Sequence, residues 1–177
     1  VKDYQERSDF LERLKDQFVI AISPSIINCL TSQDLESAQY FYRMLLRLNR
    51  SSDFENYCVK VTKSKTSQLS TLVERLCNSL DIVHSDCLAT MYKNYIALVL
   101  RKVEEMSDIE AQQKCSETEC WTRLSCCLKL TEFCGNFLLN FEKMRHSTMT
   151  SINNLNENFS RQLAELVGEP ATDLKYR

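Results

Sequence analysis

The chain has 177 residues, with 22 basic and 24 acidic side chains and a formal net charge of −2. This balance excludes the strong sequence-independent attraction to nucleic acids or anionic lipids that a highly basic chain shows. A hydrophobic fraction of 44% is too high for an intrinsically disordered chain. The length suits a single helical domain over residues 1–177 with its own core.

Residues that make tight turns are scarce. Only two glycines and two prolines occur, where average usage would give about twelve and about nine. Sheets need frequent turns, and tight turns depend on the backbone angles of these two residues. We therefore predict an all-α fold, an elongated antiparallel helical bundle or helical rod of about seven helices.

The first predicted helix has one apolar face, with three- and four-residue spacing. Its members are Tyr4, Leu11, Leu14, Phe18 and Ile22. The pair Ser23-Pro24 has the form of an N-cap followed by proline at the first helical position, which predicts a new short helix through Leu30. Thr31, with Asp34 three residues later, predicts the N-cap of the next helix.

The middle of the chain continues the helical pattern with one ambiguity. After a helix that ends in a polar joint at 49–53, polar residues at 62–68 interrupt the apolar stripe. Whether residues 52–84 form one helix or two stays open at this point. Ser85 is the predicted N-cap of a mostly buried helix, and a loop is expected at 104–116. The buried face of that helix comprises Leu88, Tyr92, Tyr95 and Val99.

Two more helices complete the pattern. The clearest stripe comprises Cys127, Leu130, Cys134, Phe137, Phe141 and Met144. Gly135 inside this helix costs about 1 kcal/mol relative to Ala, which predicts a close helix–helix contact there. The last stripe comprises Ile152, Leu155, Phe159, Leu163 and Leu166. Gly168 and Pro170 then have the positions of a helix stop.

The nine cysteines favour free thiols. An odd number at helical spacings is not a disulfide framework, and free cysteine packs as a small hydrophobic residue, as in a cytosolic protein. The group from Cys115 to Cys134 matches no zinc spacing. His84 and Cys87, with Cys77 upstream, form the best alternative ligand set, but a single His-x-x-Cys is a weak signal. We predict no metal.

No pattern of catalysis is found in the sequence. There is no glycine-rich phosphate loop, and a histidine-based triad would depend on His84 or His146 alone. We predict no enzymatic activity, no cofactor and no small-molecule substrate. The longest apolar run, residues 96–100, is far below the roughly twenty residues that span a bilayer. The missing initiator methionine predicts a fragment of a longer protein.

Some residues go beyond a generic helical pattern. They are Leu11-Glu12-Arg13-Leu14, Ser23-Pro24, Ile27, Thr31-Ser32-Gln33, Phe41 and Arg50, with Leu174-Lys175-Tyr176 far downstream. With these residues the chain resembles the subunit-seven family of the conserved oligomeric Golgi (COG) tethering complex, most strongly over residues 11–50.

The resemblance implies a helical-rod (CATCHR) fold shared with exocyst and related complexes. It also implies a non-enzymatic, peripheral role on the cytoplasmic face of the Golgi membrane, in vesicle tethering and retrograde transport. The implied partners are other subunits of the complex, chiefly subunit 5 and then 6 and 8, with only indirect membrane contact.

A tethering subunit must place an apolar helix face against another chain. The first helix is the best candidate, because it is strongly two-faced and is followed by the Ser23-Pro24 joint. Its predicted partner-binding residues are Leu11, Leu14, Phe18 and Ile22. The alternative, that this stripe completes the intramolecular core, stays open.

A second class of function is a secreted four-helix cytokine-like ligand. Size, helicity and the two glycosylation sequons at 49–51 and 158–160 favour it. Thiol titration separates the two classes, because the secreted ligand would have paired cysteines.

Overall fold

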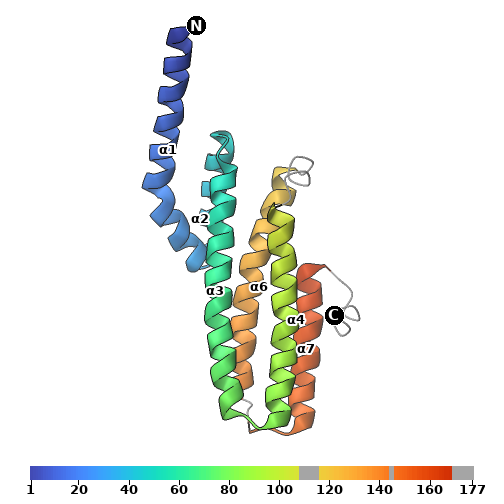
Figure 1. The fold of residues 1–177 in the computed structure, drawn as a ribbon. Helices are drawn as coiled ribbons and strands as arrows, with labels where there is room; N and C mark the ends of the chain where they lie inside the picture. The colour runs from blue at the N-terminus through green and yellow to red at the C-terminus, as the bar shows by residue number, and fades with distance from the viewer. Residues whose placement is uncertain (108–115, 144–145, 169–177) are drawn as a thin grey trace. The chain divides into compact units, whose positions relative to one another are not determined.

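A computed structural model describes residues 1–107, 116–143 and 146–168. Over these residues the chain forms six α-helices and no strand, which confirms the all-α prediction (Figure 1). The helices are α1 (Lys2–Thr31), α2 (Leu35–Arg47), α3 (Ser51–Ser79), α4 (Ile82–Ser107), α6 (Glu117–Lys143) and α7 (Met149–Val167).

The helices group into two compact units, residues 1–61 and 62–177. One uninterrupted helix, α3, belongs to both. The organisation as a single domain and the origin from a longer chain stay predictions.

In the first unit the C-terminal half of α1 packs against α2. The buried side chains are Val19, Ile26 and Leu30 of α1, Ala38, Tyr42 and Leu45 of α2, and Phe54, Cys58 and Val61 of α3. The rings of Tyr42 and Phe54 lie 5.3 Å apart, centroid to centroid. These apolar positions are three, four or seven residues apart, so each helix places one face in this core.

The second unit contains the rest of α3 together with α4, α6 and α7 (Figure 1). Helix α6 packs against both α4 and α7. It has the largest buried face, because its predicted stripe from Cys127 to Phe141 is buried throughout; Met144 lies outside the described residues. An aromatic cluster joins α6 to α7, with the rings of Phe137 and Phe159 4.0 Å apart.

The predicted helix start at Ser23-Pro24 is wrong. Helix α1 runs through Pro24 to Thr31. Proline has no N–H to donate to the carbonyl of Ile20, four residues earlier. The hydroxyl of Ser23 donates to that carbonyl instead, at 2.9 Å. This replacement bond lets the helix continue, and α1 is bent rather than straight (Figure 1), as helices with an internal proline usually are.

The predicted N-cap at Thr31 is also wrong. Thr31 is the last residue of α1, and Asp34 caps α2 by accepting a hydrogen bond from the backbone N–H of Ser37 at 3.2 Å. Both residues are acceptable caps, but a carboxylate also gains from the positive end of the helix dipole.

The ambiguity over residues 52–84 resolves to one helix and the start of the next. Helix α3 continues to Ser79, and α4 begins at Ile82 rather than at the predicted Ser85 cap. Asp81 occupies the capping position, and its carboxylate accepts from the backbone N–H of His84 at 2.9 Å.

Among the ends of the later helices, the predicted stop at Gly168 is confirmed. Ser116 and Glu119 form a capping box, in which each side chain accepts from the other's backbone N–H at 3.2 Å. Gly168 ends α7 in the left-handed conformation with φ 72°. The expected loop at 104–116 begins later than predicted, since α4 reaches Ser107, and residues 108–115 lie outside the described part. Pro170 lies outside it too.

Gly135 faces α3 but is not forced by close packing. A Cβ built there would lie 3.7 Å from the Cδ2 atom of Leu69, which is an ordinary contact distance. The expectation that close approach requires this glycine is therefore wrong.

Candidate interaction surface on the first two helices

The first half of α1 exposes most of its apolar side chains. Between residues 2 and 18 no side chain is buried, and Val19 is the first that is. Of the four predicted partner-binding residues, Leu11, Leu14 and Phe18 are 52%, 45% and 39% exposed. Ile22 is half-buried, where α1 begins to pack on α2. The core of the first unit therefore leaves the three N-terminal members of the stripe accessible within that unit.

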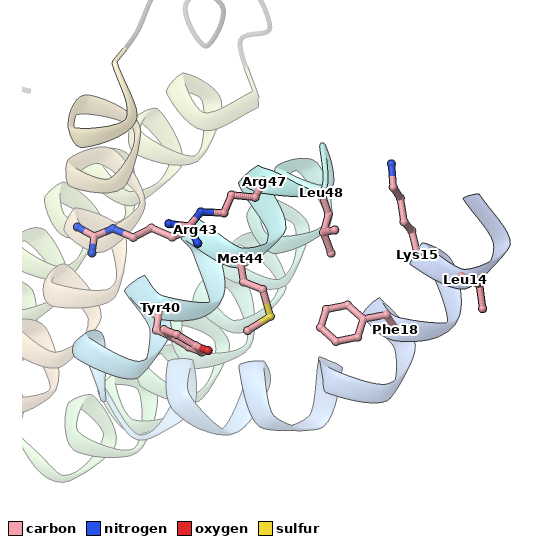
Figure 2. A pocket seen from close by; sticks show the side chains of 8 residues that line it. All are labelled: Leu14, Lys15, Phe18, Tyr40, Arg43, Met44, Arg47 and Leu48. Atoms are coloured by element: carbon pink, nitrogen blue, oxygen red, sulfur yellow. The ribbon is translucent and has the colours of Figure 1, made fainter. Parts of the chain in front are cut away.

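Two of the predicted residues, Leu14 and Phe18, line a groove of about 580 Å³ between α1 and α2. We name it the α1–α2 groove. Its lining residues are Leu14, Lys15, Phe18, Tyr40, Arg43, Met44, Arg47 and Leu48. Figure 2 shows the Phe18 ring and the Met44 thioether pointing toward one another across it.

The contribution of α2 to this groove was missed in the sequence. The residues that α2 supplies at Tyr40, Arg43, Met44 and Arg47 follow the helical spacing i, i+3, i+4, i+7. They lie opposite the buried face that contains Tyr42. The spacing is present in the sequence, but two of the four positions are charged, so the pattern of apolar residues does not mark this face of α2.

Arg50, in the connection between α2 and α3, forms ion pairs with two carboxylates in the middle of α1. Its guanidinium contacts the carboxylates of Glu12 at 2.6 Å and Asp16 at 2.9 Å. The turn that presents it contains Asn49 in the left-handed conformation, with φ 58°. A hydrogen bond from Lys15, and then the charge of Arg50, lower the pKa of Glu12. The Glu12 carboxylate therefore carries its negative charge at neutral pH.

The alternative metal ligands from the sequence have other partners. His84 pairs with Asp81, Cys77 lies 3.8 Å from the carbonyl oxygen of Ser85, and Cys87 accepts from the amide of Asn156. Over the described residues no group of three or more potential ligands comes together. The eight described cysteines are all free thiols.

The family model of Golgi complex component 7 (COG7) matches residues 1–104, more than half of the chain. The chain belongs to the COG7 family. It is therefore a non-enzymatic component of a Golgi tethering complex. No curated protein and no solved structure matches it significantly.

The COG7 match places the candidate surface inside the recognised part of the chain. Helices α1, α2 and α3 and most of α4 lie within residues 1–104, whereas α6 and α7 lie beyond them. Membership of the COG7 family implies association with the Golgi and with other subunits of the complex. It gives no support to the cytokine-like alternative. None of the helices, over the residues described, is long and apolar enough to cross a membrane.

Proposed function

We propose that this COG7-family chain acts in retrograde intra-Golgi transport, as a peripheral helical-rod (CATCHR) tether subunit on the cytoplasmic face of the Golgi. It contacts other subunits of the complex through helix–helix packing, chiefly subunit 5 and then subunits 6 and 8. The contacting face is the α1 stripe formed by Leu11, Leu14, Phe18 and Ile22, of which the first three are exposed.

The exposure of the α1 stripe carries this proposal. Large apolar side chains at one-turn spacing are the anchors that an amphipathic helix uses against a partner. Complete burial of a Leu or Phe side chain contributes about 1.5–3 kcal/mol. Leu11, Leu14 and Phe18 leave much of that contribution unused within the first unit. Covering them with another subunit would recover it.

The direct test is a Phe18→Asp variant. Phe18 is partly exposed, so the variant should keep its helicity and melting temperature while losing subunit 5 in a pull-down. Leu139→Asp is the matched control, because Leu139 is also exposed but lies on α6. Circular dichroism and immunoblotting of the captured subunits give the two readouts.

Two results would contradict this assignment. If the Phe18→Asp variant still captures subunit 5, the interface does not include Phe18. Loss of the fold would show instead that Phe18 is a core residue. A retrograde cargo reporter in cells that express only the variant then tests the transport role, and normal retrieval of the reporter would contradict it.

A further inference from the structure

Two tyrosines on successive turns of α4 face α3. The hydroxyl of Tyr92 donates a hydrogen bond to the carbonyl oxygen of Thr66 at 2.9 Å and lies 2.8 Å from the Oγ atom of Ser70. The ring of Tyr95 lies 5.5 Å from that of Tyr92, centroid to centroid, because residues three apart share a helix face. Only residues 80–81 join α3 to α4, so the two helices run in opposite directions. One turn further along α4 therefore corresponds to one turn back along α3, which places Tyr95 between Thr62 and Thr66.

Three buried hydroxyls meet at this level of the second unit. Over the described residues, the hydroxyls of Thr62, Thr66 and Tyr95 have no hydrogen-bond partner. Thr62 and Tyr95 are completely buried. Burial raises the pKa of Tyr95, and the side chain of Thr66 opposes this rise. The Thr66 hydroxyl therefore lies close to that of Tyr95, although the two make no direct hydrogen bond. A buried hydroxyl without a partner is costly, and most buried polar groups are paired with protein or with ordered water.

From these observations we propose that one buried water molecule bridges the hydroxyls of Thr62, Thr66 and Tyr95 and so links α3 to α4. Water has two protons to donate and two lone pairs. It can accept from the Tyr95 hydroxyl and donate to both threonine oxygens, and about three hydrogen bonds is the usual number for a buried water. All three groups are neutral, which favours water over an ion, because a buried ion needs a paired charge.

The water site would fix the register of α3 against α4. Fully paired polar groups specify one arrangement of a core, since a shift of one helix along the other would break their hydrogen bonds. Tyr92 makes such a link directly at Ser70, which is exposed, and Tyr95 makes the corresponding link in the core through water. In the competing arrangement each threonine hydroxyl turns back to a carbonyl of its own helix. That arrangement would not couple Thr62 to Tyr95.

A double-mutant cycle distinguishes the two arrangements. Thr62→Val and Tyr95→Phe each remove one hydroxyl and nearly keep the shape of the side chain. In urea melts of the full chain, each single variant should raise the equilibrium constant for unfolding about fivefold, because each removes one hydrogen bond to the water. The double variant should raise this constant by much less than the product of the two single effects, because both hydroxyls bind the same water.

Thr131 supplies the matched control. It is also buried, but its hydroxyl donates to the carbonyl oxygen of Leu128 in its own helix at 2.7 Å. The effects of Thr131→Val and Tyr95→Phe should therefore be additive. A high-resolution crystal structure of the unaltered chain gives the direct observation. It should show one density peak about 2.5–3.0 Å from each of the three hydroxyl oxygens, and the Thr62→Val, Tyr95→Phe variant should lack that peak.

Three results would overturn the water site. Greater stability of either single variant would show that its hydroxyl is unpaired in the folded chain, because an apolar group of the same shape then costs less. Additive losses from Thr62→Val and Tyr95→Phe would show that the two hydroxyls have separate partners. A crystal structure in which Tyr95 bonds directly to a threonine, with no density peak between them, would also contradict it. The water site does not depend on the proposed tethering role, so neither result decides the other.

Discussion

Phe137 is the centre of the aromatic cluster between α6 and α7. Its ring centroid lies 4.0 Å from that of Phe159 and 5.9 Å from that of Phe141. The side chain is only 5% exposed. Aromatic pairs such as Phe137 and Phe141, with centroids about 4.5–7 Å apart, stabilise a core beyond the area they bury. The sequence placed this residue on its clearest stripe, and the burial of Phe137 and Phe141 is confirmed.

Replacing Phe137 with Ala should lower the free energy of unfolding by about 3–5 kcal/mol, because the cavity cannot fully collapse. Leu139→Ala is the control two residues away. Its side chain is exposed, so a change within about 0.5 kcal/mol is expected. Urea melts followed by circular dichroism measure both. Equal losses in the two variants would mean that this face of α6 is not core.

The buried thiols make stability depend on alkaline pH. Burial raises the pKa of Cys127 and of Cys134 from 9.0 to about 12, and burial also raises the pKa of Tyr95. A raised folded-state pKa means that the unfolded chain ionises first. The stabilisation is therefore complete below pH 9, and it is lost progressively as pH rises from about 9 to about 12.

Between pH 9 and pH 11 we expect the free energy of unfolding to fall by up to about 1.4 kcal/mol per pH unit for each of these thiols. A Cys127→Ala, Cys134→Ala double variant should be less stable at pH 8 but should lose less with rising pH. Urea melts at four pH values give the slopes. Parallel slopes in the two proteins would show that other groups cause the alkaline loss.

At the scale of the helix, the N-terminal half of α1 lacks a core of its own. Isolated helices of this length are marginal in water, and most helical stability in proteins comes from packing. The first eighteen residues have no buried side chain. The Arg50 contacts with Glu12 and Asp16 are the long-range polar contacts that reach this segment over the described residues. Arg50 therefore determines how firmly the α1 stripe is presented.

Arg50→Ala should increase fraying of residues 2–18 without unfolding the first unit. Amide exchange in that segment should accelerate several-fold, whereas exchange near Ile26 stays slow, because that side chain is buried. Arg13→Ala removes an exposed cation from α1 itself and serves as the control. Acidification should mimic the variant: the lowered pKa of Glu12 means that its contribution is present above the ordinary carboxyl pKa and is lost as pH falls through the lowered value.

The helices could be predicted from the sequence because each has an apolar stripe at the helical period. The ends of the helices depend on which nearby side chain makes the capping hydrogen bond, and the period does not contain that information. Pro24 predicted a break, and the Ser23 hydroxyl bond that preserves α1 is invisible to periodicity. Asp34 and Asp81 cap their helices, whereas Thr31 and Ser85 were the predicted caps. In each case two good hydrogen-bond acceptors lie within a few residues of one another, so the helix could begin at either. Propensity alone does not decide between such neighbours.

Only the α1 side of the α1–α2 groove could be predicted from the sequence. The α1 half of the groove follows from an apolar stripe, and Phe18 lies where that stripe placed it. The α2 half needed the knowledge that α1 and α2 pack together, because Arg43 and Arg47 look like ordinary solvated residues until Phe18 faces Met44. A groove between two helices is a property of their packing, and the period of each helix does not contain it.

For the whole molecule, the uneven distribution of buried side chains predicts a gradient of local stability. Helix α6 has its buried face along most of its length, whereas residues 2–18 have none. Local opening is easiest where few apolar contacts are lost. In the isolated chain, amide exchange should therefore be fast over residues 2–18 and slow over residues 124–141.

Assembly into the complex should slow amide exchange at the N-terminal end of the chain only. If the α1 stripe is covered by another subunit, exchange over residues 2–18 should slow at least about tenfold in the purified complex, since burial of the anchors adds the binding free energy to local opening. Exchange over residues 124–141 should hardly change, because that core already exists in the free chain. Unchanged fast exchange over residues 2–18 in the complex would mean that the partner binds elsewhere, and slowing confined to α6 and α7 would place the interface on the second unit.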